Sequence, residues 1–311
     1  MRVLKVLFVG IGSIAKRHIR NLQNIADEKG FSLYIDAFRS TKGSSDILGI
    51  DHQFFALSDV PDNYDVVFIT NPTDIHLQTL RRFHNKGKHF FIEKPVVSLQ
   101  HIEEAKKFKL RDGSVYYVAC PLRYNAVIQY IKNNVDSDEV ISVRSISSSY
   151  LPEWRSGQDY RKSYSAHKIM GGGVSIDLIH EWDYLTYLFG WPEKVYSMIG
   201  KKSLLEIDSD DIAVYIANYK DKFVELHLDY FGRETIREIQ LFTKEDTITG
   251  DLVNNKIIFH RKGQIIDFHE KRDDVQQREL LFFLDYITGK KKCVNDILNG
   301  IKVLDLTQGK L

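Results

Sequence analysis

Three ionisable side chains occupy places in this 311-residue sequence where they could perform acid–base chemistry. Lys94 follows the apolar stretch 89–92, which predicts a buried strand, and Pro95 ends that strand because proline has no backbone N–H. The lysine amine would then lie at the carboxyl end of a strand, where open α/β sheets bind ligands. A solvated Glu-Lys pair at a strand end explains the same tripeptide when it is considered alone.

The other two side chains, Asp177 and His180, follow three consecutive glycines at 171–173. A spacing of three residues would place both on one face of a helix, opposite the apolar residues Leu178, Ile179, Trp182 and Leu185. The glycines would let a ligand or another backbone approach the start of that helix. A buried Asp–His pair with a purely structural role is the alternative.

A glycine-rich turn near the start predicts a phosphate-binding site. Gly10-Ile11-Gly12-Ser13-Ile14-Ala15 separates the apolar run 5–9 from a helical stretch. In such a turn Gly10 would allow the tight bend, Gly12 the close approach of a pyrophosphate, and Ala15 the packing of helix on strand. The phosphates would lie on the helix N-terminus beside Ser13 and Ile14. A glycine-rich turn without a ligand is the alternative.

The second predicted strand, 32–38, is followed by Arg39, Ser40, Thr41 and Lys42. An acidic residue at this point would bind a ribose 2′-hydroxyl, whereas an arginine accommodates a 2′-phosphate. Asp36 lies inside the strand, and Arg39 is the first residue beyond it. We therefore favour NADP(H) over NAD(H), which stays possible, since Arg39 and Lys42 could simply solvate a loop.

Further strands and helices alternate through the first 120 residues. The buried run 66–69 ends in Thr70-Asn71-Pro72, Thr73 is a candidate N-cap, and His76 opens the next helix. Helices over 74–86 and 99–109 and strands over 89–92 and 115–119 complete the pattern. This alternation predicts a doubly wound parallel sheet in a domain over 1–120, with Asn71 and Pro72 beside a nicotinamide ribose.

Residues 121–311 predict a different architecture. The segment 224–228 alternates apolar and polar residues, as a sheet with one packed and one open face requires. We therefore expect a second α+β domain with an open-faced, largely antiparallel sheet and helices near 125–134, 279–287 and 294–306. The predicted strands cover 140–149, 195–200, 211–219, 223–230, 236–242, 247–252, 256–260 and 264–269.

Taken in order, these motifs resemble the Gfo/Idh/MocA family of glucose–fructose oxidoreductase, inositol dehydrogenase and their relatives. The resemblance rests on the glycine turn with His18, on Thr70-Asn71-Pro72 with His76, on Glu93-Lys94-Pro95, on Arg123-Tyr124-Asn125 and on 171–183. It implies an N-terminal Rossmann domain and hydride transfer between NAD(P) and a hydroxyl carbon of a sugar, sugar nucleotide or related polyol. It also implies that Glu93 and Lys94 contact the cofactor and that the Lys94–Pro95 bond is cis.

One motif departs from the family pattern. The family's usual spacing is Asp-x-x-x-His, whereas Asp177 and His180 are one residue closer. His180 keeps the family's usual spacing to Asp183. The resemblance therefore assigns the family's catalytic histidine to His180 more firmly than it assigns the family's aspartate to Asp177. The shorter form resembles a branch associated with cell-surface sugar and nonulosonate pathways.

Oxidation of an alcohol carbon requires its hydroxyl proton to leave, so a base must contact that oxygen. We expect His180 to be the acid/base, Lys94 to polarise the oxygen and position the substrate, and Asp177 to orient its neighbour. Polar and cationic residues around 154–161 favour an anionic or nucleotide-linked substrate, although an exposed charged loop explains them equally. The candidate substrate-binding residues are Arg123, Tyr124, Arg155, Arg161 and Tyr164.

Composition narrows the class of protein. A net charge of +1 gives no electrostatic case for nucleic acid or a membrane surface, and no apolar run is long enough to span a bilayer. Cys120 and Cys293 stand far apart, which fits a cytoplasmic enzyme without a metal site. We expect a homo-oligomer, either a dimer or a tetramer. Two rival functions stay open: redox-neutral epimerisation or elimination with a retained cofactor, and non-catalytic sensing of NADP(H).

Overall fold

The chain, seen in a computed structural model that describes residues 3–40 and 49–310, divides into two compact units. The first unit comprises Met1–Ala119 and Arg272–Ile301, and the second comprises Cys120–Lys271 and Lys302–Leu311. The predicted boundary after residue 120 lies one residue from the observed division. Residues 272–301, which we expected in the second domain, belong instead to the first unit.

A six-stranded sheet forms the centre of the first unit, in the order β3-β2-β1-β4-β5-β6. All of its neighbouring strands are parallel, which confirms the predicted doubly wound arrangement. The three-residue edge strand β3 was not predicted from the sequence. The strands are β1 (Val3–Val9), β2 (Ser32–Phe38), β3 (His52–Phe54), β4 (Tyr64–Ile69), β5 (Gly87–Ile92) and β6 (Tyr116–Val118).

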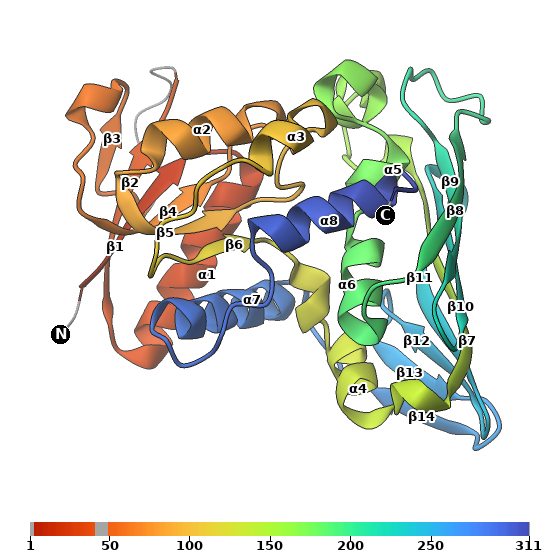
Figure 1. The fold of residues 1–311 in the computed structure, drawn as a ribbon. Helices are drawn as coiled ribbons and strands as arrows, with labels where there is room; N and C mark the ends of the chain where they lie inside the picture. Colours follow the sequence, from red (N-terminus) through yellow and green to blue (C-terminus); the bar gives the residue numbers. More distant parts are fainter. Residues whose placement is uncertain (1–2, 41–48, 311) are drawn as a thin grey trace. The chain divides into compact units, whose positions relative to one another are not determined.

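Helices cover both faces of this sheet, with α2 and α3 on one face and α1 and α7 on the other (Figure 1). The helix predicted over 74–86 is shorter, and a 3-10 turn at Thr73–Ile75 precedes it. Pro72 rather than Thr73 holds the cap position of that turn. The helices are α1 (Ser13–Lys29), α2 (His76–Phe83), α3 (Ile102–Ala105) and α7 (Arg272–Ile287), and α8 (Ile297–Thr307) runs across the division between the units.

Aromatic packing explains why α7 belongs to the first unit. Phe8, Phe68 and Phe91 stack across the centre of the sheet, with ring centroids 4.5 and 4.7 Å apart. Phe283 of α7 packs edge-on against Phe91 at 5.2 Å. The apolar side of this C-terminal helix is thereby buried on the parallel sheet. An amphipathic pattern predicts that a helix buries one side, but it does not indicate which of the two sheets that side packs against.

The second unit contains an eight-stranded sheet in the order β14-β13-β12-β11-β7-β10-β9-β8. Every neighbouring pair is antiparallel except β7 and β10, which are parallel. All eight predicted strands are present, so the expected largely antiparallel sheet is confirmed. They are β7 (Val140–Tyr150), β8 (Lys194–Gly200), β9 (Ile212–Asn218), β10 (Phe223–Asp229), β11 (Phe231–Thr243), β12 (Thr247–Asp251), β13 (Lys256–Phe259) and β14 (Gln264–Asp267).

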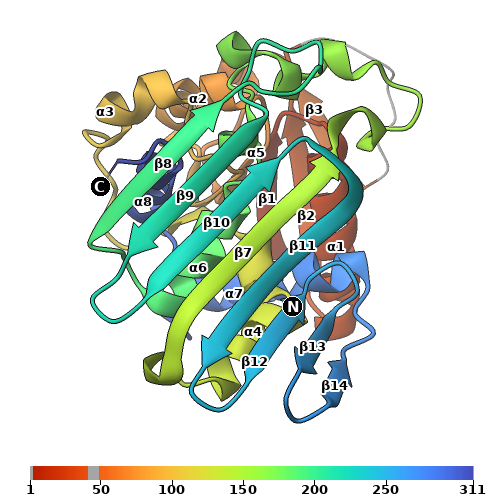
Figure 2. The same ribbon diagram turned by 90° about the vertical axis from the view of Figure 1, so that its right-hand side faces the viewer.

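One face of this sheet is packed and the other is open. Val224, Leu226 and Leu228 of β10 are buried, while Glu225 and His227 between them are partly exposed. Figure 2 shows the open face, with the helices of this unit behind the strands. These helices are α4 (Ala126–Asn134), α5 (Val174–Asp177) and α6 (His180–Phe189).

Short 3-10 turns make up much of the connection from β7 to α5. They lie at Leu151–Glu153, Tyr160–Lys162, Tyr164–Ala166 and Lys168–Met170. Others lie at Leu57–Asp59, Leu99–His101, Pro121–Tyr124 and Ser137–Glu139.

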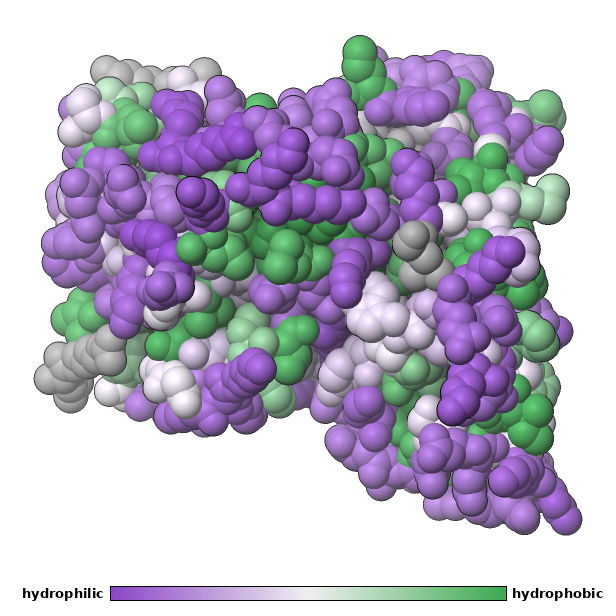
Figure 3. Space-filling model, in the orientation of Figure 1, coloured by the Kyte–Doolittle hydropathy of each residue, from purple (hydrophilic) through white to green (hydrophobic). Residues whose placement is uncertain are grey.

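Hydrophilic residues cover much of the molecular face drawn in Figure 3, with smaller hydrophobic areas between them. Over residues 3–40 and 49–310, none of the helices has the length and apolar character that crossing a bilayer requires.

Candidate functional site

The glycine turn at the end of β1 has the geometry that its sequence predicted. Gly10 has a φ of +89°, and a Cβ atom there would lie 2.8 Å from the Cα of Asn71. Only glycine therefore fits at position 10. Gly12 differs, because a Cβ there would meet no atom within 4 Å, which leaves open space beside the turn.

Helix α1 begins directly after this turn and presents an uncapped N-terminus. No side chain caps it, and its first turn, beginning at Ser13 and Ile14, holds no acidic residue. Ala15 is fully buried, as close packing of helix on strand requires. Backbone N–H groups at such an end, together with the positive end of the helix dipole, favour a phosphate.

The ends of β1, β4 and β5 are joined by hydrogen bonds. The Thr70 hydroxyl donates to the carbonyl of Gly10 over 2.7 Å. The ring nitrogens of His76 lie 2.9 Å from the Asn71 carbonyl and 3.1 Å from the Pro95 carbonyl. Burial lowers the pKa of His76, and a neutral ring, which carries a single N–H, donates to one of these two carbonyls while it lies between both strand ends. Three of the predicted cofactor-binding motifs are therefore held together.

Glu93 and Lys94 follow β5, and the Lys94–Pro95 bond is cis, as the family resemblance implied. Oε1 of Glu93 lies 2.7 Å from Nε2 of His18 in α1, and Oε2 accepts the backbone N–H of Lys94 at 3.2 Å. Burial opposes ionisation, yet His18 and Lys94 outweigh it and lower the pKa of Glu93. A carboxylate therefore supports the backbone of the predicted catalytic lysine.

Arg39 lies beside the glycine turn, because the N–H of Gly10 donates to the carbonyl of the preceding Phe38 at 3.0 Å. Its guanidinium donates to the Gln53 side chain at 2.9 Å and has no carboxylate within ion-pair distance among the described residues. Ser40 follows it, whereas Thr41 and Lys42 lie outside the described residues.

Asp36, the other candidate for the ribose, is engaged within the sheet. The hydroxyl of Tyr64 donates to its carboxylate, and Asp36 is buried. Burial raises the pKa of Asp36 despite that hydrogen bond. Arg39 and Ser40 are the described polar residues that directly follow β2 in the sequence.

In the second unit, the glycine run packs against protein atoms. A Cβ at Gly172 would lie 2.1 Å from the carbonyl oxygen of Tyr164, and one at Gly173 would lie 2.2 Å from Oδ1 of Asp210. Asp210 also accepts the N–H of Ser175 at 2.9 Å. The sequence predicted that either a ligand or another backbone approaches these glycines. In the structure, other parts of the same chain do so.

The helix expected to carry both Asp177 and His180 is interrupted. Asp177 ends α5, Leu178 leaves helical geometry at φ −95° and ψ 31°, and His180 is the first residue of α6. The prediction of one continuous helix face was therefore wrong, because α5 stops after a single turn. The apolar residues Leu178, Ile179, Trp182 and Leu185 are buried as expected.

Asp177 accepts hydrogen bonds from two tyrosines. The buried hydroxyl of Tyr230 donates to its carboxylate, and Tyr164 hydrogen bonds to it as well. Burial, reinforced by the negative charge of Asp177, raises the pKa of Tyr230, so this hydroxyl stays a donor. Sequence reasoning missed Tyr230, because it comes from the β10–β11 connection and no local spacing links it to Asp177.

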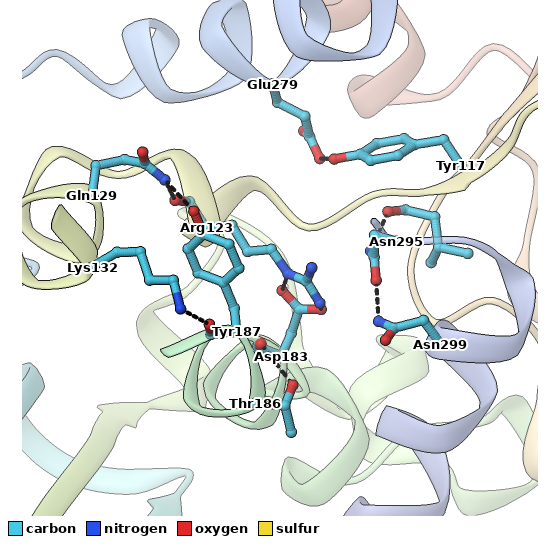
Figure 4. Close-up of polar contacts among 11 residues, drawn as sticks. Tyr117, Arg123, Gln129, Lys132, Asp183, Thr186, Tyr187, Glu279, Asn295 and Asn299 are labelled. Carbon is cyan, nitrogen blue, oxygen red and sulfur yellow. Dashed lines mark hydrogen bonds and ion pairs between the residues drawn. The ribbon is translucent and has the colours of Figure 1, made fainter. Parts of the chain in front are cut away.

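The predicted substrate-binding residues fall into two groups. Arg123 is buried and makes a bidentate ion pair with Asp183, with both bonds at 2.8 Å (Figure 4). Tyr124 beside it is also buried. Arg161 binds Asp159 and Glu206, with distances of 2.8 to 3.1 Å. These contacts give both arginines structural roles, and their contact with substrate stays a prediction.

Arg155 and Tyr164 form the second group. The Arg155 guanidinium lies 5.7 Å from the centroid of the Tyr164 ring, and Tyr164 in turn contacts Asp177. Two residues predicted to bind substrate therefore lie in one chain of contacts with Asp177. Lys94 belongs to the first unit and His180 to the second, so their meeting at one site stays a prediction.

Comparisons with protein families match most of the chain. Residues 4–119 match the model described as "Oxidoreductase family, NAD-binding Rossmann fold", and residues 128–247 match the "GFO/IDH/MocA C-terminal domain". The uncharacterized oxidoreductase YrbE of Bacillus subtilis (strain 168) is 27% identical over 187 residues, which cover 58% of this chain and 52% of YrbE. Inositol 2-dehydrogenase of Rhizobium meliloti (strain 1021) is 23% identical over 185 residues, 58% of this chain and 54% of that protein. The chain thus spans about half the length of the curated relatives that it matches.

Solved structures share the fold over nearly the whole chain. Levoglucosan dehydrogenase in complex with NADH has a TM-score of 0.83 at 16% identity, covering 99% of this chain and 96% of that one. The myo-inositol 2-dehydrogenase from Lactobacillus plantarum has a TM-score of 0.77 at 20% identity, with the same coverage of 99% and 96%. UDP-N-acetylglucosamine 3-dehydrogenase GnnA from Acidithiobacillus ferrooxidans has a TM-score of 0.74 at 17% identity, covering 100% and 97%.

Proposed function

Because this chain belongs to the GFO/IDH/MocA family of oxidoreductases with an NAD-binding Rossmann fold, we propose that it is an NAD(P)-dependent dehydrogenase or reductase. Its substrate would carry a hydroxyl group on a carbon of a sugar, sugar nucleotide or related polyol. The names of the similar dehydrogenases support this class of substrate. The observation that carries the proposal is the glycine turn, whose geometry at Gly10 and Gly12 fits a dinucleotide.

The first unit would hold the cofactor through its strand ends. The open space at Gly12 and the uncapped start of α1, at Ser13 and Ile14, suit a pyrophosphate. Arg39, with Ser40, would bind a 2′-phosphate, so NADP(H) is favoured and NAD(H) stays possible. The nicotinamide ring would give or accept the hydride. Further contacts would come from Gly10, Thr70, Asn71, Pro72, His76, Glu93 and Lys94.

Three ionisable residues would bind the substrate, transfer its proton or orient a neighbouring group. His180 would take or return the proton of the reacting hydroxyl, since its intrinsic pKa lies near neutrality. Lys94, whose backbone is held by Glu93, would donate to the same oxygen and position it. Asp177 would act as a positioning residue, held by Tyr164 and Tyr230.

Substitutions of the two proposed catalytic residues test this function. We expect Lys94→Met and His180→Gln each to lower kcat by roughly 10²- to 10⁴-fold. Lys109→Met, at an exposed lysine of the same unit, is the matched control and should retain full activity. The assay follows the nicotinamide absorbance band with sugars, sugar phosphates, sugar nucleotides and polyols. Full activity in both variants would contradict the assignment.

Two rival functions predict different signals in the same assay. A redox-neutral epimerase or eliminase would convert its substrate without net change in nicotinamide absorbance, and product analysis would reveal it. A sensor would bind NADP(H) tightly but turn over none of the compounds. We favour the dehydrogenase because a sensor would have no use for Lys94, Asp177 and His180 together.

We also propose that the protein forms a homo-oligomer, a dimer or a tetramer. The open face of the eight-stranded sheet supports this proposal, because exposed sheet surfaces commonly pair with a copy of themselves (Figure 2). Light scattering coupled to gel filtration would give the mass in solution, and a monomer at micromolar concentration would refute it.

A further inference from the structure

The second unit contains a cavity of about 460 Å³ in the connection that follows β7. Its size falls within the range of roughly 300–1,000 Å³ that is typical of small-molecule sites. The residues that line it all come from the segment 151–165. Those that matter for its chemistry are Trp154, Arg155, Gln158, Asp159, Tyr160 and Lys162.

The cavity presents two positive charges that the protein does not neutralise. Arg155 and Lys162 are exposed, and neither has a carboxylate within ion-pair distance in the described part of the chain. Asp159, the acidic residue of the lining, is held in a bidentate pair by Arg161 at 2.9 and 3.1 Å. The lining therefore carries an excess of positive charge.

An aromatic side chain stands next to these cations in a fixed orientation. The indole N–H of Trp154 donates to the Ser149 hydroxyl at 2.9 Å, and its ring packs edge-on against Tyr230, with centroids 5.2 Å apart. Even so, 37% of Trp154 is exposed. An oriented and accessible aromatic ring is a surface on which a base or sugar ring can stack.

Two neighbouring residues of the cavity wall, Trp154 and Arg155, are connected to Asp177 through tyrosines. Trp154 packs on Tyr230, whose hydroxyl donates to Asp177. Arg155 lies over Tyr164, which also hydrogen bonds to Asp177. A ligand bound in the cavity would therefore lie next to the residues that hold Asp177 in place.

From this arrangement we propose that the cavity binds the phosphoryl group of a phosphorylated substrate, with Arg155 and Lys162 as its cationic ligands. The guanidinium provides a planar fork of donors and the ammonium a point charge, a combination suited to phosphate oxygens. This inference rests on the proposed function only for the chemistry that occurs at the sugar. The phosphoryl group belongs either to a sugar phosphate or to the diphosphate of a sugar nucleotide.

Binding is measured first, since it needs no turnover. Calorimetric titration of the 311-residue protein uses uridine diphosphate and glucose 1-phosphate as probes. We expect Arg155→Gln and Lys162→Gln each to weaken binding by about tenfold or more, and Arg155→Lys to restore part of it. Lys220→Gln, at an exposed lysine in the turn between β9 and β10, is the matched control and should leave binding unchanged.

Trp154→Ala distinguishes the two sources of the phosphoryl group. If the substrate is a sugar nucleotide, this variant should bind uridine diphosphate roughly tenfold more weakly, because the stacking of the base on the indole is lost. Its affinity for glucose 1-phosphate should not change. Equal effects on both probes would assign the site to a sugar phosphate. Circular dichroism and thermal unfolding of each variant confirm that the fold is retained.

Turnover separates failure of this inference from failure of the proposed function. The protein could oxidise neutral and phosphorylated sugars with equal kcat/KM, and Arg155→Gln could leave both values unchanged. That result would overturn the proposed phosphoryl site but not the proposed dehydrogenase function. If the protein binds phosphorylated compounds but turns over none of the compounds tested, the proposed phosphoryl site is supported and the proposed dehydrogenase function is contradicted. Failure of the wild-type protein to bind either probe would also overturn the inference.

Discussion

The imidazole Nε2 of His18 lies 2.7 Å from Oε1 of Glu93, and this pair joins helix α1 to the strand end that carries Lys94. The second carboxylate oxygen accepts the backbone N–H of Lys94 at 3.2 Å. One carboxylate thus links the helix predicted to bind phosphate with the lysine predicted to contact substrate. It should influence both stability and catalysis.

We expect the stability of the protein to depend on the ionisation of Glu93. Folding lowers its pKa from the ordinary 4.5, so its contribution is present above pH 4.5 and is lost as the pH falls through the folded-state pKa. Glu93→Gln should therefore show a shallower decrease in Tm on acidification than the wild type. Thermal unfolding at a series of pH values checks this, with exposed Glu28→Gln as control. Parallel curves for Glu93→Gln and wild type would contradict it.

The two glycines of the turn should respond differently to alanine. Gly10→Ala would force a left-handed φ on alanine and place its Cβ against Asn71, so we expect lower stability, by about 1–3 kcal/mol. Gly12→Ala meets open space, so we expect normal stability but weaker dinucleotide binding. Urea unfolding and fluorescence titration with NADPH measure the two effects. A destabilised Gly12→Ala with unchanged binding would show that Gly12 serves the fold and not the dinucleotide.

Arg39 should decide the choice between the two dinucleotides. Loss of its guanidinium removes a charge-assisted contact of about 1.5–3 kcal/mol, so Arg39→Gln should weaken NADPH binding by roughly 10- to 100-fold. NADH binding should change little. Titration of both cofactors into wild type and variant gives the ratio. Equal weakening of both would show that Arg39 does not contact a 2′-phosphate.

The buried Arg123–Asp183 pair should matter more for stability than for substrate binding. Arg123→Met would leave Asp183 buried and unpaired, which costs about 3–5 kcal/mol, whereas Arg123→Met with Asp183→Leu should recover much of that loss. Chemical unfolding of the wild type and both variants measures this. A stable Arg123→Met variant with a raised KM would instead identify Arg123 as a substrate ligand.

Tyr230 should act through Asp177. Tyr230→Phe removes one hydrogen bond to the carboxylate, and we expect kcat to decrease several-fold with little change in KM. Tyr219→Phe is a matched control, because it also removes a hydroxyl hydrogen bond, to the carbonyl of Gly190 at 3.2 Å. Each substitution should cost about 1 kcal/mol of stability. An equal decrease in kcat for both would assign Tyr230 a purely structural role.

The hydrophobic pattern predicted most of the fold, because strands buried on both faces form continuous apolar runs and strands with one open face alternate apolar and polar residues. The alternation Val224-Glu225-Leu226-His227-Leu228 marked β10, and its apolar residues are indeed the buried ones. Gly10 was identified because only glycine suits its backbone geometry. Short edge elements lack such a signal, which explains why the three residues of β3 were missed.

Long-range partners were beyond the reach of pattern reasoning. Tyr230 is separated from Asp177 by 53 residues, and Asp210 meets Gly173 from a different connection. The interruption at Leu178 was also missed, because the apolar spacing on both sides suits one helix. The bonds of Arg161 to Asp159 and Glu206 were not predicted either, and its contact with substrate stays a prediction.

The single parallel pair of the second sheet, β7 with β10, gives this unit room to diversify. The chain does not pass directly from β7 to its parallel neighbour: it leaves the sheet after Tyr150, returns at Lys194 in the edge strand β8, and reaches β10 only after β9. That excursion contains Trp154, Arg155 and His180, while the strands on either side keep their register through their own partners. Insertions and deletions should therefore be tolerated in its exposed part, the 3-10 segments before the buried residues of α5 and α6, which would let related proteins change what they recognise without rebuilding their framework.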